Sequence, residues 1–134
     1  MGYRMWQSGG EFKILRVNHG KVLEALTRFV KGLQGKVSVS GYVRNLCPEE
    51  NWRNLILAFG DLRWNVNVDV DYNIIAIQFG GENLWDDKSL FEAVAPYVED
   101  GSFIEMTGDE GEKWRWVFKD GGLKEIYAKV VWEE

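Results

Sequence analysis

Few residues in this chain could do chemistry. It contains one histidine, His19, and one cysteine, Cys47. A lone histidine excludes zinc sites built from several imidazoles and mechanisms that use a histidine pair. His19 follows Asn18 at a predicted helix start, so we expect an exposed first-turn residue rather than a general base. Cys47 precedes Pro48 at a second predicted helix start, where a thiol pKa can fall. No partner base can be identified, so we expect a packed or capping thiol.

A D-x-D-x-N string formed by Asp69, Asp71 and Asn73 begins like a calcium-binding loop. Such a loop needs glycine at its sixth position and a bidentate glutamate at its twelfth. The chain has Ile74 and Gly80 at those places. The string therefore does not predict a calcium site.

Two more patterns have both a chemical and a structural interpretation. The carboxylates at positions 109–112 could form a glycosidase pair, but they lie between two predicted strands, so we expect a solvated hairpin tip. Trp114 and Trp116 with Arg115 could stack on single-stranded nucleic acid. Stacking sites lie in basic grooves, whereas this half of the chain is acidic. We therefore expect core tryptophans and no nucleic acid among the partners.

The elements that position these residues are clearest in the last third of the chain. The stretch SFIEMTGDEGEKWRWVFKDGGLKEIYAKVVW, residues 102–132, predicts three strands joined by two tight, glycine-containing turns. In the middle strand apolar and charged residues alternate with the period of two that places alternate side chains on opposite faces. One face carries Trp114, Trp116 and Phe118, and the other carries Lys113, Arg115, Val117 and Lys119.

Earlier elements follow from apolar periodicity and from cap and turn residues. We predict a strand over Glu11–Arg16, and the preceding GYRMWQSGG fits either a short strand or an ordered arm. We further predict a helix from Asn18 to Gly35, a second helix from Pro48 to Gly60, a hairpin of Trp64–Val70 with Ile74–Phe79, and a third helix capped by Asp86 or Asp87. The nearly all-apolar second arm of the hairpin predicts a strand covered on both faces. Pro96 should kink or end the third helix near Tyr97. Residues 36–45 fit either a short strand or a loop.

This element order predicts an α+β fold over one domain, residues 1–134. Helices would pack on one face of an antiparallel sheet. Without the second helix and the last hairpin the order is β-α-β-β-α-β, which favours a ferredoxin-like core extended by a C-terminal hairpin. A more general α+β sheet is the alternative.

Composition limits the class of protein. The chain has 134 residues, of which 46% are hydrophobic and 14% aromatic, which excludes disorder. It has neither an apolar run of membrane-spanning length nor a signal peptide, so we expect a cytoplasmic protein that does not bind membranes. A single cysteine excludes an internal disulfide and agrees with a reducing compartment. We expect no cofactor and no enzymatic activity.

The two halves of the chain carry opposite charge. Residues 1–63 hold ten Lys or Arg against five Asp or Glu, a net charge of +5, and residues 64–134 hold six against sixteen, a net charge of −10. The halves could interleave and leave mixed charge on the surface. Alternatively, the C-terminal sheet could present an acidic face that attracts a basic partner.

Three segments of the chain are similar to known sequences. The opening MGYRMWQ, the segment FEAVAPYVEDGSFIEMTGDEGEKWRWVF and the close KVVWEE resemble small uncharacterised proteins of bacteriophages, prophages and other mobile elements. The resemblance implies a genomic context in which small proteins bind and modulate host or competitor factors. It carries no catalytic residue to this chain.

The last predicted strand is apolar on both sides. Its first face, on the side of the core tryptophans, carries Ile126, Ala128, Val130 and Trp132. Its second face carries Tyr127 and Val131, and there only Val117 of the neighbouring strand offers an apolar contact. Either an N-terminal arm folds across that face or a second molecule covers it, because exposed apolar patches usually mark interfaces. The predicted binding residues are Arg115, Val117, Lys119, Tyr127, Val131 and Trp6.

These observations favour a non-enzymatic protein-binding module. Its partner would be a host or defence factor, which it could inhibit through the acidic C-terminal half, or a second copy of the chain in a homodimer. The alternative is a small-ligand sensor or enzyme with a pocket between helices and sheet. Aromatic walls would come from Trp52, Trp64 or Trp85, and polar groups from Arg53 or Asp69.

Overall fold

A computed structural model describes residues 3–33, 51–83 and 85–129 of the chain. Its elements in chain order are β1 (Met5–Glu11), η1 (Arg16–Asn18), α1 (His19–Leu33), α2 (Asn51–Asp61), β2 (Trp64–Val68), β3 (Ile74–Phe79), α3 (Asp87–Val94), η4 (Ala95–Tyr97), β4 (Phe103–Gly108), β5 (Lys113–Lys119) and β6 (Gly122–Tyr127). The residues predicted as a strand or loop at 36–45, the Cys47–Pro48 helix start and the proposed contact Val131 lie outside the described residues.

The strands form two antiparallel sheets. One has four strands in the order β1-β4-β5-β6, and the other is the β2-β3 hairpin. The predicted α+β class and antiparallel sheet are confirmed. The ferredoxin-like core is not confirmed, because the described strands form two separate sheets instead of one.

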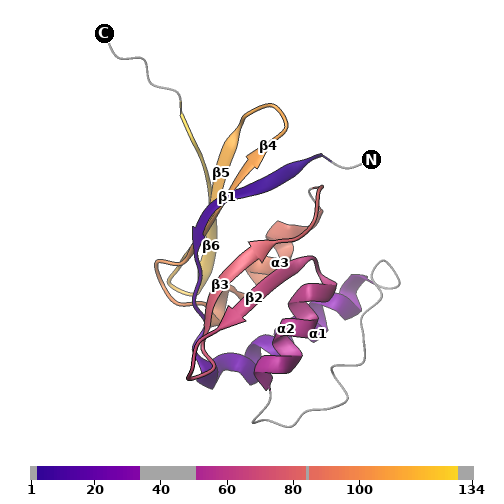
Figure 1. Cartoon of the computed structure of the whole chain (residues 1–134), viewed down its shortest axis with the longest axis vertical. Coiled ribbons are helices and arrows are strands. Elements are labelled where there is room, and N and C mark those ends of the chain that lie inside the picture. Colours follow the sequence, from indigo (N-terminus) through magenta and orange to yellow (C-terminus); the bar gives the residue numbers. More distant parts are fainter. Residues whose placement is uncertain (1–2, 34–50, 84, 130–134) are drawn as a thin grey trace.

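The two sheets meet along β1 and β3 (Figure 1). Isolated bridges join Arg4 to Asn83 and Ile14 to Ile74 at the two ends of this junction. Between these bridges, the side-chain amide of Gln7 bonds the backbone of β3, where a neighbouring strand would otherwise do so. Its Nε2 donates to the Ile77 carbonyl at 3.0 Å, and its Oε1 accepts the Phe79 N–H at 2.7 Å. One side chain therefore joins the edges of the two sheets.

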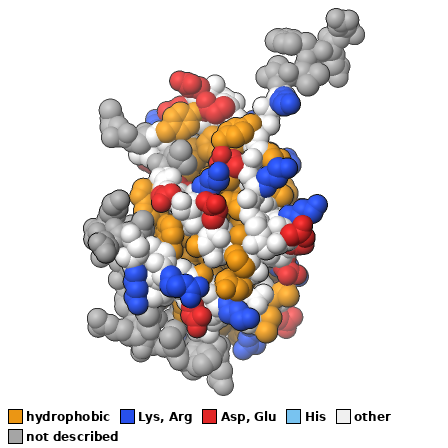
Figure 2. All heavy atoms as spheres, turned by 180° about the vertical axis from the view of Figure 1, so that it is seen from behind, with side chains coloured by type: hydrophobic (Ala, Val, Ile, Leu, Met, Phe, Trp, Pro, Cys, Tyr) orange, Lys and Arg blue, Asp and Glu red, His pale blue; other side chains and the backbone are white. Residues whose placement is uncertain are grey.

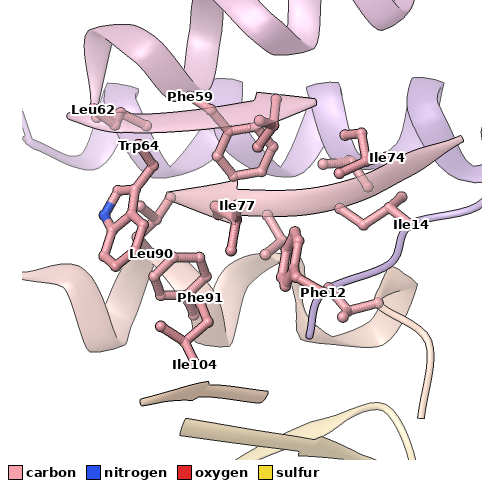
Figure 3. Packing of buried hydrophobic residues seen from close by; sticks show 14 of the residues in the cluster. Phe12, Ile14, Phe59, Leu62, Trp64, Ile74, Ile77, Leu90, Phe91 and Ile104 are labelled. Carbon is pink, nitrogen blue, oxygen red and sulfur yellow. The ribbon is translucent and has the colours of Figure 1, made fainter. Parts of the chain in front are cut away.

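One core joins the two sheets to the helices α1, α2 and α3. Phe91 of α3 lies between Trp64 and Ile104 (Figure 3). Its ring centroid is 4.9 Å from that of Trp64 in β2, 5.6 Å from that of Trp116 and 6.1 Å from that of Phe118, both in β5. The predicted inward face of β5 is confirmed, since Trp114, Trp116 and Phe118 are all buried. Edge-to-face aromatic contacts thus connect both sheets.

Pro96 acts as predicted. The α-helix α3 ends at Val94, and the chain continues as the short 3₁₀ helix η4. Proline has no N–H and its ring crowds the preceding turn, so it stops the helical hydrogen-bond pattern. This break lets the chain turn back into β4.

Several local predictions are wrong. The first strand spans Met5–Glu11, and Gly9 and Gly10 are accommodated by a register shift between Gln7 and Gly9. As a result the N-terminal arm is paired with β4 and does not cross the face of the sheet. The hairpin strand β3 is not covered on both faces, because Ile75 is 47% exposed.

The prediction that His19 is exposed is also wrong. The residue is buried at the start of α1, with only 2% of its surface exposed. Burial, with the nearby Arg16 charge, lowers the His19 pKa below its ordinary value. The lone histidine therefore belongs to the packed interior, not to a solvated helix start.

Candidate functional site

The surface most suited to binding is the outward side of the four-stranded sheet, which we call the open face. Strand register defines it, because residues directly opposite each other share a face. Arg115 lies opposite Glu105 on one side and Ile126 on the other, and Trp6 lies opposite Thr107. The full set on this face is Trp6, Glu11, Phe103, Glu105, Thr107, Lys113, Arg115, Val117, Lys119, Lys124 and Ile126.

A line of polar contacts crosses the open face. Arg115 Nε donates to Glu105 Oε1 at 2.9 Å, and Ser8 Oγ donates to Glu105 Oε2 at 3.0 Å. Thr107 Oγ1 in turn donates to Ser8 Oγ at 2.8 Å. The Arg115 and Ser8 hydrogen bonds lower the pKa of the Glu105 carboxyl. The Arg115 guanidinium also lies over the Phe103 ring, 4.7 Å from its centroid. These contacts fix the position of the Arg115 side chain.

The charge of the open face is positive. It carries the four cations Lys113, Arg115, Lys119 and Lys124 against two carboxylates, Glu11 and Glu105. One of these carboxylates, Glu105, is already paired with Arg115. The net −10 of the C-terminal half is therefore not a property of this surface.

The other acidic residues of that half that the structure describes lie off this face. Three of them occupy the exposed β4–β5 turn: Asp109, Glu110 and Glu112. There the Glu110 N–H donates to Glu112 Oε1 at 3.3 Å. Seen from behind, the molecule shows basic and acidic side chains interspersed with hydrophobic ones (Figure 2). This distribution agrees with the interpretation that the two halves interleave.

A hollow of about 240 Å³ opens beside Arg115 at the β5–β6 end of this surface. Its lining consists of Glu105, Lys113, Trp114, Arg115, Ile126, Tyr127 and Ala128. Lys113 and Arg115 supply positive charge, the Glu105 carboxylate is paired with Arg115, and Ile126 supplies an apolar wall. The hollow could take a side chain that combines a carboxylate with aliphatic carbons.

The structure brings together four of the six predicted binding residues. Arg115, Val117 and Lys119 lie on the open face of β5, and Trp6 lies on the same face of β1 with 51% of its surface exposed. Val131 is outside the described residues. Tyr127 was predicted on this face and lies on the other, because it is opposite the inward-facing Trp114.

Ile126 is the residue that the sequence prediction missed. It was expected to point inward with Ala128, yet it lies opposite Arg115 on the open face and is 39% exposed. The reason is the two-residue turn at Asp120–Gly121, which pairs Lys119 with Gly122 and so fixes which residues of β6 face outward. Both turn residues have positive φ, as this tight turn requires.

The residues predicted to line the alternative small-ligand pocket lie in two separate parts of the structure. Trp64 is fully buried in the core, and its Nε1 donates to the buried Asp87. Trp85 contributes its backbone N–H to the same carboxylate. Trp52 instead stacks on Tyr72, with 4.9 Å between ring centroids, and Arg53 lies over Trp52.

The Asp87 carboxylate forms a buried network at the start of α3. It accepts hydrogen bonds from Trp64 Nε1 at 2.9 Å, from the Trp85 N–H at 2.9 Å and from Arg63 Nη2 at 3.1 Å. Arg63 Nη1 donates to the Asn83 carbonyl at 2.7 Å. These hydrogen bonds connect the start of α3 to β2 and to Arg63.

Asp69 in the D-x-D-x-N string closes the β2–β3 loop. Its Oδ1 accepts the backbone N–H groups of Asp71 at 2.9 Å and Asn73 at 3.0 Å. Desolvation opposes the shift, but these hydrogen bonds lower the pKa of the Asp69 carboxyl. This is the local turn bonding typical of Asp and Asn side chains.

Within the described ranges, no three His, Cys, Asp or Glu side chains are grouped so that they could hold a metal ion. None of the helices in the same residues has the length and apolarity to cross a membrane. Comparison of the chain with protein-family models, curated proteins and solved structures finds no match.

Proposed function

We propose that this chain is a non-enzymatic, cytoplasmic protein-binding module that docks its partner on the open face. The main support for this proposal is that the open face has a net positive charge and exposes Trp6 and Ile126. Tryptophan and arginine are the residue types that most often dominate interface energetics. Both are present on this face, and Arg115 is already held by Glu105 and Phe103.

The partner that fits this face is acidic. Sequence reasoning suggested an acidic surface acting on a basic partner, but the four cations on the open face favour the opposite sign of charge. Complementary charge speeds association and discriminates against wrong partners more than it adds affinity. Binding should therefore weaken as salt screens the lysines.

A role in mobile-element biology rests on the resemblance of the three sequence segments alone. Small proteins of that context occupy host or defence factors. Inhibition by occupation needs a rigid complementary surface and no catalytic group. We propose that the open face is the surface that covers such a factor.

A protein partner is favoured over nucleic acid by the aromatic geometry. Base-stacking surfaces present several free ring faces in a basic groove. Here the Phe103 ring is covered by Arg115, which leaves Trp6 as the exposed aromatic ring of the open face. The chain also carries a net charge of −5, which disfavours a phosphate backbone.

The proposal is tested by affinity capture from host lysate with mass spectrometry, using matched charge reversals. Lys113→Glu combined with Lys119→Glu reverses charge on the open face. Lys21→Glu combined with Arg28→Glu does the same at exposed positions of α1. We expect the wild type and the α1 variant to retain the same acidic protein at low salt, and the open-face variant to lose it.

Two outcomes would contradict the proposal. One is retention of the same protein by both double variants. The other is a nuclease-sensitive capture together with polyuridine binding that the open-face variant abolishes. That second result would show that the partner is a single-stranded nucleic acid and not a protein.

A further inference from the structure

The edge of the four-stranded sheet at β6 suggests a second interaction, beyond the proposed function. In the described part of the chain, β6 pairs with β5 alone and is the terminal strand of the sheet. A terminal strand carries backbone donors and acceptors that can pair with another chain. Two large apolar side chains, Ile126 and Tyr127, are exposed on this strand at 39% and 64%.

The register shows which backbone groups of β6 are available. The Ala128 N–H donates to the Lys113 carbonyl at 3.0 Å, so residue 128 bonds toward β5. Antiparallel bonding alternates along a strand, so Ile126 and Lys124 also bond toward β5. The alternate residues, Leu123, Glu125 and Tyr127, direct their N–H and C=O groups to the open edge.

Only certain antiparallel registers of two β6 strands use these groups. Both members of a hydrogen-bonded pair must direct their groups to the same interface, so odd-numbered residues pair with odd-numbered ones. If each strand is also to pair at least about five of residues 122–128, the twofold axis passes through residue 124, 125 or 126. The first choice places Lys124 opposite its own copy, and the second places Glu125 opposite its own copy. Like charges directly opposite each other are destabilising.

The third register has no such repulsion. An axis at Ile126 places the two Ile126 side chains together and Lys124 opposite Ala128 of the second copy. It also places Glu125 opposite Tyr127 of the second copy. Within one chain the Tyr127 hydroxyl already donates to Glu125 Oε2. The same donor and acceptor can therefore pair across the axis.

We propose that two copies of this chain join β6 to β6 in antiparallel register with Ile126 on the twofold axis. The two four-stranded sheets then form one continuous eight-stranded sheet. Because the axis is perpendicular to the sheet, both open faces lie on the same side. The dimer would present the proposed binding surface twice to one large partner.

Disulfide trapping tests the register. In a Cys47→Ser background, Ile126→Cys places two thiols at a non-hydrogen-bonded pair, where Cα atoms are about 4.5 Å apart, within the range that a disulfide spans. Lys124→Cys is the matched control on the same face, displaced from its own copy in this register. We expect Ile126→Cys to form a covalent dimer at least about tenfold faster. Equal rates, or a faster Lys124→Cys reaction, would overturn the register.

Light scattering coupled to size exclusion tests the dimer itself and requires no partner, so its result is independent of the capture experiment. We expect twice the 15.5 kDa chain mass at high micromolar concentration. Ile126→Lys should return the mass to that of one chain. Ile75→Lys, at an exposed position of β3, should not. A wild-type mass of one chain would overturn the proposal.

Discussion

At the scale of single residues, His19 makes the stability of the protein depend on pH. Its Nε2 is buried without a hydrogen-bond partner among the described residues, so protonation would place an unpaired charge in the interior. Burial and the Arg16 charge lower its pKa in the folded state. In the unfolded chain the pKa returns to its ordinary value of about 6.5.

Acidification should therefore destabilise the fold before the carboxylates titrate. Below about pH 6.5 the unfolded state binds the His19 proton more readily, so the free energy of unfolding decreases as pH falls through that value. Glu105 and Glu125 have lowered pKa values, and their contribution is lost only at more acidic pH, below about 4.5. We expect the melting temperature to fall between about pH 7 and pH 5.

His19→Gln separates the two effects, because the amide does not titrate. Thermal unfolding followed by circular dichroism should show a flatter pH dependence for this variant above about pH 5 and an unchanged decline below it. Parallel profiles for the wild type and the variant over the upper range would assign the pH dependence to another group.

At the scale of elements, the junction between the two sheets depends on Gln7. Its amide bonds the Ile77 carbonyl and the Phe79 N–H, two backbone groups that would otherwise lack a partner at the β1–β3 contact. Gln7→Leu removes both bonds and leaves the backbone groups partly buried. We expect a loss of about 2 kcal/mol in the free energy of unfolding, because unpaired buried polar groups are costly.

The control for this prediction is Gln78→Leu, at an exposed position of β3 next to the same junction. Exposed substitutions of this kind change stability by about 0.5 kcal/mol or less. Urea titration of both variants gives the comparison. Equal stabilities would mean that the Gln7 amide does not hold the sheets together.

At the scale of the whole molecule, Phe91 connects elements that are far apart in the chain. Its ring contacts Phe12, Trp64, Trp116 and Phe118, which belong to the segment after β1 and to both sheets. The sheets therefore share one core, and they should unfold together. Phe91→Ala should cost about 3–5 kcal/mol, the usual range for removing a buried aromatic ring.

This prediction is checked by urea unfolding monitored by tryptophan fluorescence and by far-ultraviolet circular dichroism. Coincident transitions are expected for the wild type and for Phe91→Ala, since a single core unfolds as one unit. Transitions that separate in the wild type would show that the β2–β3 hairpin and the four-stranded sheet are independent.

How far the fold could be predicted from sequence depends on the strength of each local pattern. The alternation in β5 is regular and has charged residues on one side only, so Trp114 and Trp116 were placed correctly. Pro96 and the helix around Leu26 follow from equally local rules. By contrast, β6 carries one charged residue and at least one apolar residue on each face, Lys124 with Ile126 and Glu125 with Tyr127, so its pattern does not show which face is buried. Its orientation depends on the length of the turn at Asp120–Gly121.

Tertiary contacts explain the other differences. Gly9 and Gly10 weaken the strand signal of β1, and only pairing with β4 reveals it. The burial of His19 depends on neighbours from elsewhere in the fold, which a one-dimensional pattern does not contain. The open face could be predicted in part, because Arg115, Val117 and Lys119 alternate with the core tryptophans. The sign of its charge required the register of the neighbouring strands.

The Arg63–Asp87 contact has a consequence for how this chain can vary. Arg63 adopts a φ of 75°, a conformation that suits glycine, and yet its guanidinium neutralises the buried Asp87. Glycine would relax the backbone but would leave the Asp87 carboxylate without a cation. Lysine would keep the charge but could not bond both the Asp87 carboxylate and the Asn83 carbonyl with two fixed N–H groups. Arg63 is only partly buried, yet replacing it alone would leave the buried Asp87 carboxylate without its cation, so the two positions should tolerate change only together.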